Sequence, residues 1–157
     1  MDPVAVAASW LHLLATVTLL GYYAVLAVFL VPVLRRTLAE AQLAATLATI
    51  ERRALPILIG SLAVFLATGI YLMGADTRYG GIGAIGSSWA TVMLFKHVFV
   101  VALVGLALVV DALFVRAAAA DDAAVRTRTL RRLTTGLWGV TLLAVVILLL
   151  TALAQTS

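Results

Sequence analysis

The sequence contains no cysteine. This absence excludes disulfide bonds, metal sites built on thiolates and covalent haem attachment through a Cys-x-x-Cys-His motif. It also weakens the case for a Cu(I) site, because Cu(I) prefers soft sulfur ligands. Any bound metal or metal-containing group must therefore be held by other side chains.

Charged residues are also scarce, at 11% of the chain against 64% hydrophobic residues. A soluble domain has about a quarter charged residues. The apolar residues form four long runs, at about 4–34, 54–73, 89–115 and 133–153. Runs of about 20 apolar residues cross the hydrocarbon core of a bilayer as helices, and no run alternates as a strand would. We therefore expect an all-α integral membrane protein, an up-down four-helix bundle that forms a single domain over residues 1–157.

The arginines indicate how this bundle lies in its membrane. Four of them fall in the linker 35–53 and five in the linker 116–132, whereas the loop between the second and third runs has only Arg78. Positive residues concentrate on the cytoplasmic side, so both linkers should be cytoplasmic and both termini outside. We expect a multi-pass protein of the bacterial cytoplasmic (inner) membrane. Topology explains the net charge of +4, so the lipid bilayer is the expected partner and nucleic acid is not.

Histidine is nearly absent, and this makes the two histidines informative. His12 is the only Asp, Glu, His, Lys or Arg between residues 4 and 34, and His97 lies in an equivalent apolar setting in the third run. An ionisable side chain at membrane depth is costly and marks a candidate functional site. Both histidines should lie roughly 12 Å below the outer boundary, given the rise of an α-helix.

The first and third runs should be diagonal partners in an up-down bundle, about 11–14 Å apart. Two imidazoles at this separation could bind one haem iron from opposite faces, so His12 and His97 are predicted to be the metal ligands of a b-type haem. A non-haem metal site, a proton relay and a purely structural role are the alternatives.

Five further residues are predicted to line this site. Thr16, or a backbone carbonyl, could hold the second ring nitrogen of His12. Thr68 and Gly69 of the second run should reach a similar depth. Arg78 and Lys96 lie near the outer level, where the propionates of a haem need cationic partners.

Two other features have simpler interpretations. The segment 81–86 matches GxGxxG but has no strand before it, so we expect a flexible loop and no dinucleotide site. Asp111 is expected near the cytoplasmic boundary, in an ion pair with Arg52, Arg53 or Arg116, and proton entry is the alternative role.

Three segments resemble a known family. WLHLLATVTLLGYYAVLAVFLVPVLRR, ERRALPILIGSLAVFLATGIYLMG and SSWATVMLFKHVFVVALVGLALVVDALFVR are similar to the first three helices of the copper-resistance protein CopD family. The layout is also distantly similar to HemJ-type protoporphyrinogen oxidases, which have four helices and bind haem b. This resemblance implies His12 and Lys96 as the functional pair. His97 departs from the family pattern. The Met- and His-rich outer segments that are expected for copper handling are also missing.

Together these features predict a CopD-like membrane protein that binds haem b and works in redox chemistry or electron transfer. An enzymatic version would be a haem-dependent membrane oxidoreductase, with a quinone or another redox partner. The alternatives are a copper-handling or small-solute transport protein and a structural subunit of a membrane complex. The sequence also leaves a homo-oligomer open.

Overall fold

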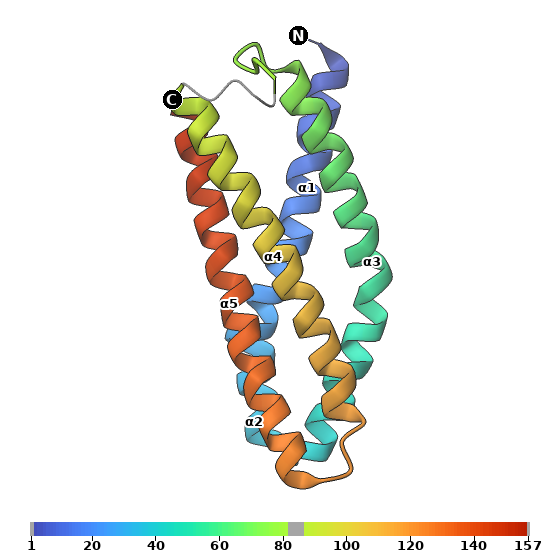
Figure 1. The fold of residues 1–157 in the computed structure, drawn as a ribbon. Coiled ribbons are helices and arrows are strands. Elements are labelled where there is room, and N and C mark those ends of the chain that lie inside the picture. Colours follow the sequence, from blue (N-terminus) through green and yellow to red (C-terminus); the bar gives the residue numbers. More distant parts are fainter. Residues whose placement is uncertain (1, 82–86, 157) are drawn as a thin grey trace.

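A computed structural model describes residues 2–81 and 87–156, and every regular element in this part of the chain is helical (Figure 1). The elements in order are α1 (Pro3–Val25), η1 (Leu26–Leu30), α2 (Val31–Thr37), α3 (Glu40–Ala75), α4 (Ser88–Ala118) and α5 (Ala123–Thr156). The first three form one continuous helix with a local change of register. With α3, α4 and α5, this helix makes four that are long and apolar enough to cross a membrane. The all-α prediction is confirmed, and the apolar composition fits a multi-pass membrane protein.

The helices extend well beyond the predicted apolar runs. The linker 35–53 is helical except at residues 38 and 39, because α2 ends at Thr37 and α3 runs from Glu40 to Ala75. A helix that started with the apolar run at residue 54 would have Pro56 in its first turn. Because α3 starts earlier, Pro56 lies inside the helix. The predicted glycine-rich loop falls mainly on residues 82–86, which lie outside the described residues; Gly81, just before them, has a φ of 97°.

Capping residues fix two of the helix starts. The Asp2 carboxylate accepts a hydrogen bond from the Val4 amide at 2.9 Å, and Pro3 follows in the first turn. The Ser87 hydroxyl accepts from the Ala90 amide at 3.1 Å at the start of α4. Each cap satisfies an amide that the helix itself leaves without a partner.

A π-helical segment interrupts the first long helix just before Pro32. Proline has no amide hydrogen, and its ring clashes with the carbonyl one turn earlier. The helix accommodates the proline by widening one turn over η1, where the Val31 amide donates to the Leu26 carbonyl, five residues back. Leu26 and Ala27 are buried in this turn, so the irregular segment packs in the core.

The four long helices form two closely packed pairs. The most extensive contact joins α4 to α5, and the next joins α1 to α3; thinner contacts between α3 and α4 and between α1 and α5 close the bundle. In Figure 1 the α1–α3 pair and the α4–α5 pair diverge toward the end that holds the chain termini. α1 and α4 are therefore diagonal, as predicted for the helices that hold the two histidines.

The two ends of the bundle differ in what they contain. We call the end with the start of α1, the end of α5 and the α3–α4 connection the loop end. The opposite end, with the start of α3 and the α4–α5 turn, is the linker end (Figure 1). The buried core is thickest toward the linker end, where Leu26, Leu47, Phe114 and Leu133 are almost inaccessible. The loop end is less tightly packed and holds the candidate site.

Candidate functional site

A cavity of about 390 Å³ lies at the loop end, and all four long helices contribute to it. We call it the loop-end cavity. It brings together five of the predicted site residues, namely His12, Gly69, Arg78, Lys96 and His97. Thr16 and Thr68 do not line it.

The His12 side chain is half-buried and held against α3. Its Nδ1 lies 3.1 Å from the Phe65 carbonyl and 3.0 Å from the Thr68 hydroxyl oxygen. A carbonyl can only accept, and the Thr68 hydroxyl already donates to the Val64 carbonyl at 2.6 Å. Nδ1 must therefore carry the proton, which leaves the lone pair of a neutral imidazole on Nε2.

Thr16 has a different role from the one considered for it. Its hydroxyl donates to the His12 backbone carbonyl at 2.7 Å, one turn back in the same helix. Of the two partners proposed for the second ring nitrogen, the backbone carbonyl is the one found, and it belongs to Phe65 on α3. Thr68 supports the same nitrogen, so it acts on the site through His12.

The imidazole of His12 also packs face to face on an aromatic ring. Its centroid lies 4.5 Å from that of Phe65, with 22° between the ring planes. A Cβ atom on Gly69 would lie only 3.2 Å from Cε1 of His12, so glycine is what lets the ring lie so close to α3. Hydrogen bond, stacking and close approach together fix the direction of Nε2.

His97 lies in a different environment, which corrects the prediction of equivalent settings. Its side chain is exposed, although it reaches the loop-end cavity. Its Nδ1 lies 2.6 Å from the Met93 carbonyl in the same helix. This carbonyl can only accept, so His97 also carries its proton on Nδ1 and has its lone pair on Nε2.

The heptad spacing of α4 explains the difference between Lys96 and its neighbour. Buried residues recur at Trp89, Leu103, Val110 and Ala117, and Lys96 falls on the same row. Lys96 is half-buried and lines the cavity together with His12. His97 is turned by about 100° from that row, since an α-helix has 3.6 residues per turn.

Arg78 closes the cavity at the loop end. It pairs with Asp76 at 3.0 Å, donates to the Ala154 carbonyl on α5 at 3.1 Å and lies 5.4 Å from the centre of the Trp89 ring. Hydrogen bonds from the Arg78 side chain and amide hold the pKa of Asp76 below its usual range. Arg78 is thus the ion-pair partner of Asp76.

The loop-end cavity offers two kinds of side chain that a haem requires, imidazole donors and cations. No group of three or more His, Cys, Asp or Glu side chains gathers anywhere in residues 2–81 and 87–156. His12 and His97 would instead supply nitrogen ligands to a haem, whose iron is otherwise bound by its porphyrin. Two cationic side chains, Lys96 and Arg78, lie at the same cavity. The residues present therefore fit the group.

The linker end holds a polar cluster that the sequence reading missed. Asp111 makes no ion pair with Arg52, Arg53 or Arg116, because the one salt bridge in the described part of the chain is that of Arg78 with Asp76. Its neighbour is instead the buried Glu51 of α3. The signal was present in the sequence, since Glu51 stands seven residues from both Ala44 and Leu58 on the buried row of α3.

Comparison with protein-family models, with curated proteins and with solved structures gave no match to this chain.

Proposed function

We propose that the loop-end cavity binds a b-type haem through Nε2 of His12 and Nε2 of His97, and that the protein transfers electrons in the membrane. The observation that carries this proposal is the matched chemistry of the two imidazoles. Each commits Nδ1 to a backbone carbonyl and keeps the Nε2 lone pair, and both line one cavity. Histidines that bind metals commonly donate their other ring nitrogen in this way.

Two imidazole ligands favour electron transfer over oxygen binding. When bound, a haem would supply an iron that alternates between the ferric and ferrous states, and His12 and His97 would both bind it and leave no site for oxygen. The chain contributes orientation. Phe65 and Gly69 hold the ring of His12 in place. Lys96 and Arg78 would neutralise the propionates, and the apolar lining would exclude water.

The setting of this activity follows from the arginine-rich linker end. We place that end in the cytoplasm of a bacterium and the loop-end cavity near the outer face of its inner membrane. A quinone or a redox protein would then exchange electrons with the site from that side. Catalysis by a haem-dependent oxidoreductase acting on a quinol or a porphyrin is the enzymatic form of the same proposal. The exposed side of His97 leaves room for a homo-oligomer or a partner subunit.

The visible spectrum of the purified full-length protein tests the proposal. After expression with ample haem supply, we expect a Soret band and, on reduction, the sharp α and β bands of low-spin haem. His12→Ala and His97→Ala should each lose the low-spin spectrum, and Thr91→Ala, on the exposed face of α4, should retain it. Lys96→Gln compares the two candidates for the second functional residue. If Lys96→Gln loses the bands and His97→Ala keeps them, Lys96 takes the role proposed for His97.

A colourless protein after haem reconstitution would overturn the haem proposal. The arrangement of the cavities then favours copper handling or small-solute transport as the alternative. The loop-end cavity shares Phe65 and Val100 with a central cavity of about 330 Å³, which shares Leu55 and Asp111 with a third cavity at the linker end. Stoichiometric copper in metal analysis would support that alternative.

A further inference from the structure

A third cavity, of about 550 Å³, lies at the linker end between α3 and α4. We call it the linker-end cavity. Glu51 and Asp111 both line it, with Arg52 beside them and Ala118 and Ala119 at the end of α4. Glu51 is only 5% exposed and is the one charged residue among the buried side chains of the described chain.

The two carboxyl groups lie within hydrogen-bonding reach of each other. One oxygen of Glu51, Oε2, accepts a hydrogen bond from the Tyr22 hydroxyl of α1. The other oxygen, Oε1, and Oδ1 of Asp111 are both buried, and no N–H or O–H group of the described residues donates to them. Two ionised carboxylates only accept, so this arrangement leaves two buried acceptors unsatisfied.

The surroundings supply no cation that would stabilise two negative charges. Arg52 lines the cavity but is exposed and forms no ion pair with either carboxylate in the part of the chain described. Tyr23 of α1 lines the central cavity with Asp111 and contributes a hydroxyl group but no cation. On the other side, α5 packs on α4 through Gly136 against Val110 and has no ionisable side chain after Arg132. Adjacent carboxylates in such a setting repel each other strongly.

A single proton resolves both problems. Placed between Oε1 of Glu51 and Oδ1 of Asp111, it turns two unsatisfied acceptors into a donor and an acceptor, and it removes one of the two charges. Pairs of this kind titrate as a unit, because neither group holds the proton alone. Uptake converts two carboxylates into one hydrogen-bonded carboxylic acid–carboxylate pair, and release restores both charges.

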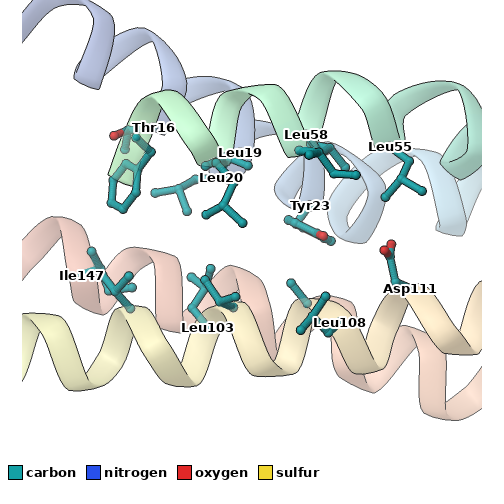
Figure 2. Close-up of a pocket in the computed structure, with 16 residues that line it drawn as sticks. Thr16, Leu19, Leu20, Tyr23, Leu55, Leu58, Leu103, Leu108, Asp111 and Ile147 are labelled. Carbon is teal, nitrogen blue, oxygen red and sulfur yellow. The ribbon is translucent and has the colours of Figure 1, made fainter. Parts of the chain in front are cut away.

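We propose that Glu51 and Asp111 form a proton-binding site, which exchanges its proton through the linker-end cavity. The route is short, since the cavity reaches the last residues of α4 beside the exposed Arg52. In the other direction, Asp111 and Tyr23 lie at one end of the central cavity and Thr16 at the other (Figure 2). The lining between them is almost entirely apolar, so the proton is held at the linker end and is not passed along side chains.

Infrared difference spectroscopy of the full-length protein in lipid nanodiscs tests this site directly. At neutral pH, we expect the carbonyl stretch of a protonated carboxylic acid, which shifts when the medium is exchanged for D₂O. Glu51→Gln and Asp111→Asn should each abolish this band. Asp121→Asn is the matched control, because Asp121 is an exposed carboxylate of the α4–α5 turn, and it should leave the band unchanged.

Two results would overturn the proposal without depending on the folding of these variants. The first is the absence of a protonated carboxyl band from the unmodified protein at neutral pH. The second comes from Tyr22→Phe, which removes the hydrogen bond to Oε2 and should shift the band without abolishing it. An unshifted band in Tyr22→Phe would assign the proton to a different carboxyl group. None of these outcomes depends on haem, so this site stands or fails separately from the proposed electron transfer.

Discussion

At the scale of single residues, the site depends on how α3 receives the imidazole of His12. Sequence spacing placed His12, Thr68 and Gly69 at one depth, and the structure adds the reason why each residue type is needed. Thr68 and the Phe65 carbonyl fix the proton on Nδ1, and Gly69 provides the space. This arrangement makes Gly69 a sensitive position, even though glycine carries no chemistry of its own.

Gly69→Ala should displace the imidazole and weaken its hydrogen bonds, because the new Cβ would lie 3.2 Å from Cε1. Alanine favours a helix by ~1 kcal/mol over glycine, and a hydrogen bond contributes about as much, so we expect little or no net gain in stability. Gly60→Ala is the control on the same helix, where a Cβ meets nothing within 4 Å, and it should be stabilising. Thermal unfolding in detergent compares the two, and an equal gain in both variants would contradict a tight contact at Gly69.

At the scale of helices, the α4–α5 pair is built around small residues. A Cβ on Gly136 would lie 2.7 Å from Cγ2 of Val110, and one on Gly139 would lie 2.9 Å from Cδ2 of Leu106. Small residues let helix backbones approach closely and gain van der Waals contact, which is the main force between helices in lipid. These two glycines explain why α4 and α5 form the most extensive contact of the bundle.

Gly136→Ala should separate α4 from α5 and destabilise the protein by about 1–3 kcal/mol, the usual cost of overpacking. Val110→Ala should restore part of the loss, because it removes the methyl group that the new Cβ meets. Unfolding of the two single variants and the double variant measures the coupling between the positions. Additive effects would show that Gly136 and Val110 do not contact each other, and Gly105→Ala provides a control in open space.

At the scale of the whole molecule, the three cavities lie in line between the two helix pairs. The loop end holds imidazole and cationic side chains, and the linker end holds the carboxyl pair. The central cavity between them is lined almost entirely by apolar side chains (Figure 2). The bundle thus keeps two chemically different sites apart, one at each end, and the orientation of the chain decides which compartment each site meets.

The orientation can be tested cleanly because the chain has no cysteine of its own. Thr77→Cys and Asp121→Cys place one thiol at each end of the bundle, at exposed positions. We expect a membrane-impermeant maleimide added to intact cells to label Thr77→Cys, and Asp121→Cys only after the cells are opened. The reverse pattern would place the arginine-rich linkers outside and overturn the orientation predicted from charge.

The sequence by itself determined the number of long helices, the apolar part of each and the diagonal placement of the two histidine-bearing helices. These properties are local or follow from connectivity, since hydropathy, capping and helix period act over a few residues. Only the tertiary structure decided that His12 bonds to residues 53 and 56 positions away. The same holds for the meeting of Glu51 with Asp111 and Tyr22, from three different helices. Such meetings depend on how each helix rotates and how closely it packs, and these follow from side-chain fit across the bundle and not from the period of any one helix.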